Sequence, residues 1–181
     1  KYLKNFTDEI LTLPEKINTT LDTDKITKTL APHIATKEHI FFIGRGIDYP
    51  LCLEGALKLK EISYIHCEGY GAGELKHGTI SLIEEGTLVA AVSTQPMLYQ
   101  KTISNIVEVK ARGAFVMAVT IEGNRAMEKA ADYVVYLPET NRWFTNSLAI
   151  IPLQLFAYYV AVNRGCDVDK PRNLAKSVTV E

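Results

Sequence analysis

Short runs of apolar residues, separated by helical patterns, dominate this chain from residue 39 onward. Runs of this length, bounded by turn-forming residues, are typical of parallel strands that are buried on both faces. We predict five such strands, at residues 39–44, 65–68, 87–92, 114–119 and 133–137. The alternation of strands with helices predicts an α/β fold, a three-layer αβα sandwich around a mostly parallel sheet of about five strands.

Helical periodicity fills the intervals between these strands and the region before them. Apolar residues three or four apart predict two helices before residue 37, with the break at Pro14. Pro50 suits the first turn of the next helix, which is expected to run to about residue 64. Glycines 69, 71 and 73 are expected to form a turn after the second strand. The remaining helices are predicted at residues 97–112, 124–131 and 146–164.

The pattern changes in kind after Gly165, where the last helix is expected to end. Residues 165–181 show no sustained period and contain several turn-forming residues. We therefore divide the chain into a helical lead-in (1–38), an α/β domain (39–164) and a C-terminal tail (165–181). Because the chain opens with Lys1 and is periodic from the start, we expect it to be part of a longer or processed polypeptide.

Charge and apolar content limit the classes of function. The chain has 20 basic and 21 acidic residues, whereas a nucleic-acid-binding surface needs a basic excess, so no nucleic acid partner is expected. Residues 148–162 are strongly apolar but judged too short to cross a bilayer, so no membrane partner is expected either. The three cysteines are scattered without metal-ligand spacing, which predicts reduced thiols in a cytoplasmic protein. No phosphate-cradling loop motif occurs, and we expect no cofactor and no metal.

Three charged residues interrupt the otherwise apolar helix that begins near Pro50. At about 100° per residue, Glu54, Lys58 and Glu61 fall within an arc of about 60°. The arc can be a solvated stripe of ion pairs, each contributing a few tenths of a kcal/mol. It can equally be a pocket wall on which a carboxylate, held by the lysine, acts as a general base. The spacing leaves both interpretations open.

Two further positions could carry chemistry. His77 lies in the glycine-rich stretch and could transfer protons near neutral pH, although most loop histidines are only surface residues. Lys176 lies five residues from the chain end, where solvent exposure is usual. If the tail docks on the domain, desolvation favours the neutral amine that imine formation requires. His66 lies in an apolar strand and is expected to be a core histidine.

Three blocks of sequence resemble the glucosamine-6-phosphate synthase family. They are LEGALKLKEISYIH at residues 53–66, GELKHG at 73–78 and PRNLAKSVTVE at 171–181. The resemblance implies the second sugar isomerase (SIS) subdomain with its tail, in a cytoplasmic homodimer. The glutaminase domain and the first SIS subdomain would belong to the same polypeptide outside this chain. The implied reaction converts fructose 6-phosphate and glutamine-derived ammonia to glucosamine 6-phosphate, the first step of UDP-N-acetylglucosamine synthesis.

The resemblance also implies roles for individual residues. Lys176 matches the lysine that forms a Schiff base with the C2 ketone of the sugar. Glu61 matches the base that moves a proton between C1 and C2, and Lys58 matches the lysine beside it. His77 matches a histidine implicated in ring opening, which reaches the active site of the neighbouring subunit.

The supporting positions and one departure complete the comparison with the family. Glu54, Ala175 and Arg172 match supporting or substrate-binding residues. Residues 93–96 read Ser-Thr-Gln-Pro where a phosphate-holding SIS subdomain carries a Ser/Thr-rich loop, and proline removes a donor N–H. The resemblance therefore places the main phosphate loop in the first SIS subdomain, and we expect this chain alone to be inactive. The alternative is a non-catalytic module that binds sugar phosphates and serves as a sensor.

Overall fold

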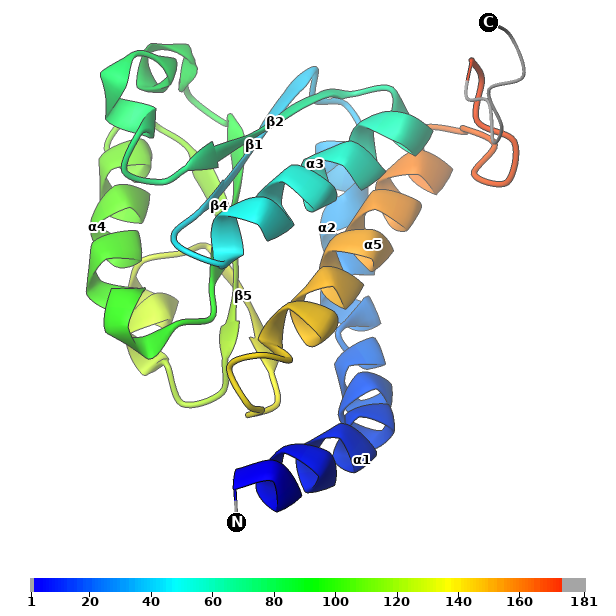
Figure 1. The fold of residues 1–181 in the computed structure, drawn as a ribbon. Helices are drawn as coiled ribbons and strands as arrows, with labels where there is room; N and C mark the ends of the chain where they lie inside the picture. Colours follow the sequence, from blue (N-terminus) through cyan, green and yellow to red (C-terminus); the bar gives the residue numbers. More distant parts are fainter. Residues whose placement is uncertain (1, 174–181) are drawn as a thin grey trace, which may run out of the picture.

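Five parallel strands form the central sheet in the computed structural model, which describes residues 2–173, with side chains from residue 6 onward (Figure 1). The strand order is β2-β1-β3-β4-β5, so β2 and β5 are the edges. This sheet confirms the predicted fold class. The strands are β1 (His39–Gly44), β2 (His66–Gly71), β3 (Leu88–Ser93), β4 (Phe115–Ile121) and β5 (Tyr133–Leu137).

Helices cover both faces of this sheet. On one face α3 and α5 pack against each other, and α2 packs on α5, whereas α4 lies on the opposite face (Figure 1). The α-helices are α1 (Tyr2–Leu21), α2 (Asp24–Ile34), α3 (Asp48–Ser63), α4 (Tyr99–Lys110) and α5 (Thr145–Asn163). Short 3₁₀ helices occur at η1 (Leu75–His77), η2 (Thr79–Leu82), η3 (Pro96–Leu98) and η4 (Arg125–Lys129).

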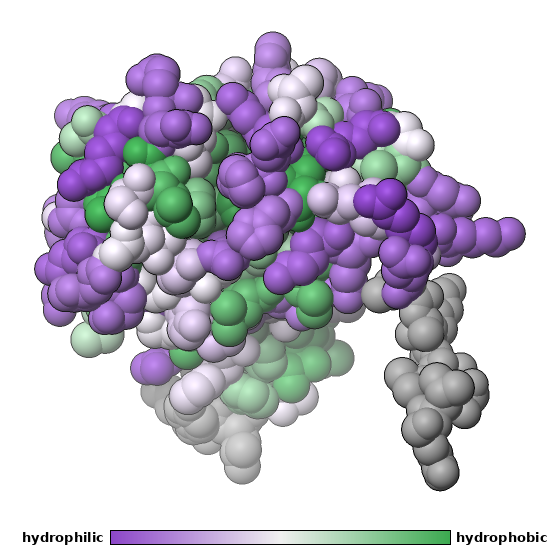
Figure 2. Space-filling model, turned by 90° about the horizontal axis from the view of Figure 1, so that it is seen from above, coloured by the Kyte–Doolittle hydropathy of each residue, from purple (hydrophilic) through white to green (hydrophobic). Residues whose placement is uncertain are grey.

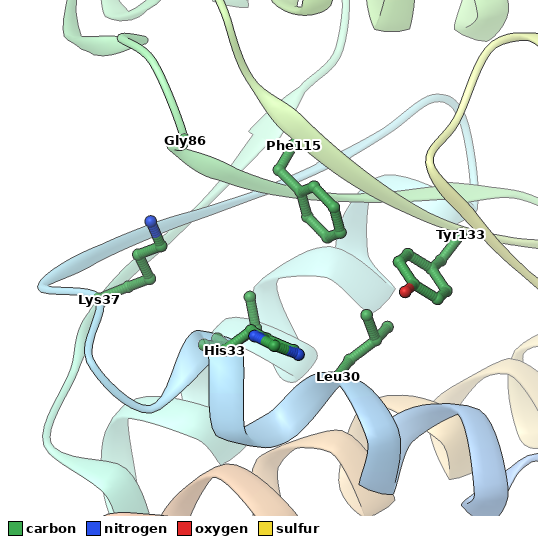
Figure 3. A pocket seen from close by; sticks show the side chains of 7 residues that line it. Leu30, His33, Lys37, Gly86, Phe115 and Tyr133 are labelled. Carbon is green, nitrogen blue, oxygen red and sulfur yellow. The ribbon is translucent and has the colours of Figure 1, made fainter.

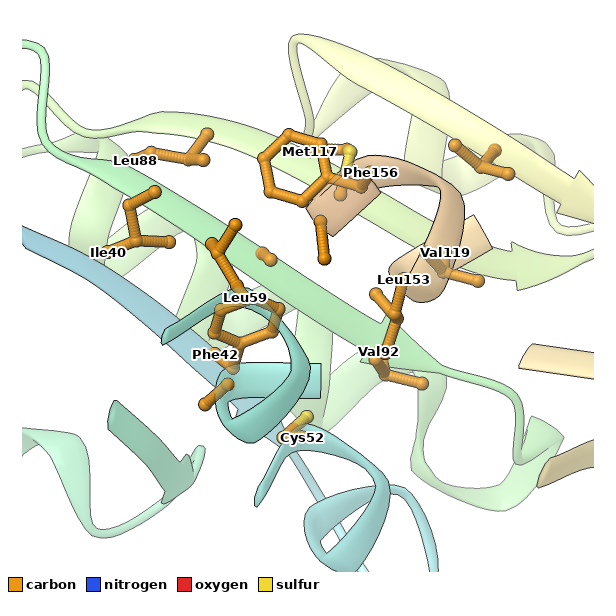
Figure 4. Close-up of a cluster of buried hydrophobic side chains, with 14 of the residues drawn as sticks. Ile40, Phe42, Cys52, Leu59, Leu88, Val92, Met117, Val119, Leu153 and Phe156 are labelled. Atoms are coloured by element: carbon orange, nitrogen blue, oxygen red, sulfur yellow. The ribbon is translucent and has the colours of Figure 1, made fainter. Parts of the chain in front are cut away.

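Each strand contributes to a hydrophobic core on both sides of the sheet, because successive side chains point to opposite faces. In β1, Phe42 belongs to the cluster beneath α2, α3 and α5, where it meets Leu59 and Phe156 (Figure 4). Its neighbours Phe41 and Ile43 belong to the cluster beneath α4 and η4. Burial on both faces explains why the strands read as continuous apolar runs rather than as alternating patterns.

Helix α5 corrects the expectation that its segment is too short to cross a bilayer. Its 19 residues meet the length and apolarity of a membrane span, although half of the apolar window is buried inside the protein. Leu153, Phe156 and Val160 are buried in the core, where α5 packs against α2 and α3. A helix covered on most sides by protein has the same apolar composition as a membrane span. Packing in the core therefore accounts for this composition.

Two predictions about the helices were wrong. Pro14 lies inside α1, and the break between the first two helices falls at residues 22–23 instead. There the Thr23 hydroxyl donates a hydrogen bond to the Thr20 carbonyl, and the chain turns. Side-chain bonds of this kind compete with helical ones. The predicted helix at 124–131 forms only the 3₁₀ helix η4.

The second strand is longer than predicted, because two glycines assigned to a turn belong to it. β2 continues to Gly71, and Gly69 pairs with Phe42 of β1. A Cβ atom at Gly69 would lie 2.9 Å from the backbone nitrogen of Leu53 in α3. Gly69 therefore serves the close approach of strand to helix rather than a turn.

Candidate functional site

The charged arc predicted on α3 forms a connected group in the structure. Lys58 Nζ lies 3.0 Å from Glu61 Oε2 and 3.6 Å from Glu54 Oε1. Glu61 is the least exposed of the three, with 23% of its side chain accessible. The hydrogen bond to Glu61 is the main cause that raises the pKa of Lys58 above its ordinary value, with further attraction from both carboxylates. The lysine therefore keeps its charge and holds the Glu61 carboxylate in place.

Exposed leucines lie next to this arc. Leu53 is 45% exposed and Leu57 is 39% exposed, on the flank of α3 beside Glu61. A stripe of solvated ion pairs does not need exposed leucines, whereas a surface that contacts a further domain or a subunit commonly combines apolar and charged groups. This mixed surface favours a pocket wall or a domain contact over a purely solvated face.

The segment after α5 approaches the C-terminal end of α3. The backbone N–H of Arg172 donates to the hydroxyl of Tyr64 at 2.9 Å, and the Arg172 guanidinium lies 4.1 Å from the centre of the Tyr64 ring. Tyr64 caps α3 three residues after Glu61. In Figure 1 the segment that follows α5 lies beside the last turn of α3. Arg172 thus lies near the Glu61 end of the arc, while Ala175 and Lys176 lie outside the described residues.

His77 belongs to η1 and lies outside the charged arc. It ends η1, six residues after β2 finishes at Gly71, whereas Glu61 lies on the part of α3 that leads into the start of β2. Among the described residues, no hydrogen bond or ion pair joins His77 to the arc. The structure therefore does not assemble these predicted residues within one chain.

The carboxyl ends of β1 and β3 meet at the switch point of the sheet, where folds of this kind usually place a ligand. Here that position holds the chain's own carboxylate. Asp48 is 1% exposed, and it accepts hydrogen bonds from the backbone N–H of Thr94 at 2.9 Å and from the Thr94 hydroxyl at 2.5 Å. Burial raises the pKa of Asp48, while the bonds from Thr94 act against this change. Both Thr94 donors at this position are therefore already used by Asp48.

Sequence reasoning missed this Asp48–Thr94 pair. The available signal was that Thr94 directly follows β3, while Asp48 begins the helix that follows β1, and these two strands are parallel neighbours that end on the same side of the sheet. The charged arc, in contrast, runs along α3 toward the end of the sheet at which β2 begins. His66 was placed wrongly as well, since it is exposed on the edge strand β2 rather than buried in the core.

A cavity of about 430 Å³ lies at the N-terminal ends of the strands and contains none of the predicted site residues. Figure 3 shows Phe115 and Tyr133 of the sheet facing Leu30 and His33 of α2. Its lining is mainly apolar, with Lys37 at its edge (Figure 3). This cavity therefore has no carboxylate base and does not serve as the candidate catalytic site.

Neither buried cysteine is suited to nucleophilic chemistry. Cys52 and Cys67 are buried, and burial raises the pKa of both thiols, that of Cys67 to about 12. Thiolates are the nucleophilic form, and burial in apolar surroundings disfavours them.

The parallel sheet covered by helices is the fold of the sugar isomerase (SIS) domain. The SIS domain family model matches residues 33–164, and the chain belongs to this family. Its match begins six residues before the start of the domain that we predicted at residue 39.

Particular relatives are more specific than the family. The chain is 55% identical over 179 residues to glutamine–fructose-6-phosphate aminotransferase [isomerizing] of Clostridium tetani, and 54% identical over 173 residues to the protein of that name from Caldanaerobacter subterraneus. These matches cover 99% and 96% of this chain but only 29% and 28% of the relatives. A solved C-terminal domain of glucosamine-fructose-6-phosphate aminotransferase from Francisella tularensis has a TM-score of 0.84 at 36% identity, covering 92% of this chain and 47% of that one. The chain thus spans less than a third of the curated relatives' length.

Proposed function

We propose that this chain is the second SIS subdomain, with its tail, of a glutamine–fructose-6-phosphate aminotransferase. The full polypeptide would add a glutaminase domain and a first SIS subdomain, and would make glucosamine 6-phosphate for UDP-N-acetylglucosamine synthesis in the cytoplasm. The observation that carries the proposal is the Glu54–Lys58–Glu61 group beside the docked start of the tail. The relatives' names support the same activity.

In this mechanism the residues of the chain have distinct tasks. Lys176 attacks the C2 carbonyl of the open-chain sugar and forms an imine with loss of water. Glutamine-derived ammonia then replaces Lys176 at C2, which releases the lysine amine and leaves an imine of the sugar with ammonia. Glu61 removes a proton from C1 and returns it to C2, which requires a carboxylate aimed at the reacting carbons and gives glucosamine 6-phosphate. Lys58 holds that carboxylate by its 3.0 Å hydrogen bond. A sensing module would need neither the ion group nor the tail, which favours the enzyme.

The phosphate of the sugar is held outside this chain in the proposed enzyme. At the switch point the Thr94 donors already bind Asp48, and Pro96 has no N–H to offer. Phosphate anchoring would then come from the first SIS subdomain, opposite the exposed flank of α3. The active site would be completed only when both subdomains are present.

The isolated chain is therefore expected not to isomerise fructose 6-phosphate at a measurable rate. Without the phosphate contacts, the binding energy that positions the sugar is lost. Conversion by the isolated chain is compared with conversion by the full-length polypeptide at equal molar concentration. Turnover close to that of the full-length polypeptide would contradict the proposed division of the site.

Dimer formation is the second expectation, because the resemblance implies that His77 acts in the neighbouring subunit and no hydrogen bond or ion pair among the described residues joins it to the arc. A histidine that acts on the sugar must then come from a second copy, with the loop at residues 69–78 near the contact. Sedimentation of the chain at high micromolar concentration should show a dimer. Exchange of amide hydrogens in this loop should slow as the concentration rises, and a monomer with unchanged exchange would remove the role of His77 in the neighbouring subunit.

A further inference from the structure

Two histidines from neighbouring strands meet at the free edge of the sheet. His39 and His66 are register partners at the start of β1 and β2, and β2 is an edge strand. Their Nδ1 atoms are 3.3 Å apart, with ring planes inclined by 81°. Neither residue belongs to the charged arc. The pair therefore needs an explanation of its own.

The separation of the two nitrogens suits a shared metal ion. Two imidazole nitrogens on one tetrahedral Zn²⁺, each at about 2.0–2.1 Å, lie about 3.3–3.4 Å from each other. The same separation also permits a hydrogen bond between two neutral rings, so distance alone does not decide. The surroundings of the pair distinguish the two possibilities.

A carboxylate supports the second nitrogen of His66. Glu68 Oε1 lies 3.5 Å from His66 Nε2, and the hydroxyl of Tyr70 donates to Glu68 Oε2. These three side chains follow each other on one face of β2, because the strand repeats every two residues. A histidine that binds metal through one ring nitrogen commonly presents the other to a carboxylate, which fixes the ring and makes it a stronger ligand.

The pair also faces open space with a further acidic group. His39 and His66 line a cavity of about 340 Å³, and Glu84 and Ser81 are among its other polar walls. A cavity of this size has room for an ion together with its water ligands. Within the described residues, no group of three or more ligand side chains gathers around one point. Water would therefore complete the coordination of any ion held by the pair.

We propose that His39 and His66 bind a divalent transition-metal ion, such as Zn²⁺, Ni²⁺ or Cu²⁺, through their Nδ1 atoms. Imidazole ligands favour these ions over Mg²⁺ and Ca²⁺, which prefer oxygen. The bound ion links edge strand β2 to β1 without taking part in the proposed sugar chemistry. Because open water positions remain, the ion is exchangeable rather than permanently bound.

Calorimetric titration with Zn²⁺ tests the site on the 181-residue chain, in a Cys166→Ser background that removes the one cysteine that is not buried. We expect one ion per chain and no binding of Mg²⁺. His39→Ala and His66→Ala should each lower the affinity at least tenfold, and the double variant should bind no more tightly than the weaker single variant. Glu68→Gln should lower the affinity about 10–100-fold, as loss of a carboxylate behind a ligand does.

His33→Ala is the matched control, since His33 is also exposed but lies on α2 in the cavity of Figure 3. Its affinity for Zn²⁺ should equal that of the background chain. Nitrogen NMR of the imidazoles should place the ion on both Nδ1 atoms, and circular dichroism confirms that each variant is folded. The proposal is overturned if Zn²⁺ does not bind, or if folded His39→Ala and His66→Ala variants bind it unchanged. A hydrogen bond between neutral rings would then be the function of the pair.

Discussion

Replacing Lys176 by arginine in the full-length polypeptide is expected to abolish synthesis of glucosamine 6-phosphate. A guanidinium stays protonated and cannot attack the sugar carbonyl, although it keeps the charge and the approximate length of lysine. Borohydride reduction in the presence of fructose 6-phosphate should trap a covalent adduct on Lys176 in the wild-type polypeptide and none in the variant. Peptide mapping by mass spectrometry identifies the modified lysine.

Lys170→Arg is the matched control for this experiment, because Lys170 is an exposed lysine in the same segment after α5. It should leave both trapping and product formation unchanged. A Lys176→Arg polypeptide with near-normal synthesis would refute the assignment. An adduct mapped to Lys58 would move imine formation to α3 and remove the catalytic purpose of the tail.

Replacing Glu61 by glutamine is expected to lower the rate of product formation about 10²–10⁴-fold, the usual loss when a general base is removed. The imine should still form, so borohydride trapping should persist while exchange of the C1 and C2 protons with solvent stops. This combination separates loss of the base from loss of substrate binding. The amide also removes the negative charge that helps to raise the pKa of Lys58, so the pKa of Lys58 should fall in this variant.

Two other changes on α3 serve as comparisons. Glu54→Gln alters the weaker partner of Lys58, at 3.6 Å instead of 3.0 Å, and should cost less than Glu61→Gln. Lys60→Gln alters an exposed residue outside the arc and should leave the rate unchanged. If Glu61→Gln retains the wild-type rate, or loses no more than Lys60→Gln, the base must be sought elsewhere.

Under the proposed function, the active site is completed by groups outside this chain. The flank of α3 exposes Leu53 and Leu57 beside the ion group, and a sugar placed there would still lack a phosphate anchor. Asp48 occupies the position where the sheet would offer such an anchor. The fold thus supports the proposal that this subdomain supplies the acid–base groups, while the first SIS subdomain supplies the phosphate contacts.

Local patterns in the sequence were sufficient to predict the sheet and the charged arc. Burial on both faces produces continuous apolar runs, so all five strands were found, and helical geometry placed Glu54, Lys58 and Glu61 on one face. Local patterns were insufficient where a distant segment decides the outcome. Gly69 was taken for a turn residue because its need for space against Leu53 exists only after α3 packs on β2.

The sequence by itself determined the class of fold, the grouping on α3 and the resemblance to one enzyme family, since these depend on neighbours within a few residues. Only the tertiary structure decided which distant residues meet. Asp48 and Thr94 are 46 positions apart, and His39 and His66 are 27 positions apart. Each pair forms because the strands are parallel and joined by crossover helices. Their starts therefore lie side by side at one end of the sheet, and their carboxyl ends lie side by side at the other. The strand order and register that create these contacts arise from packing over the whole core, which no short stretch of sequence encodes.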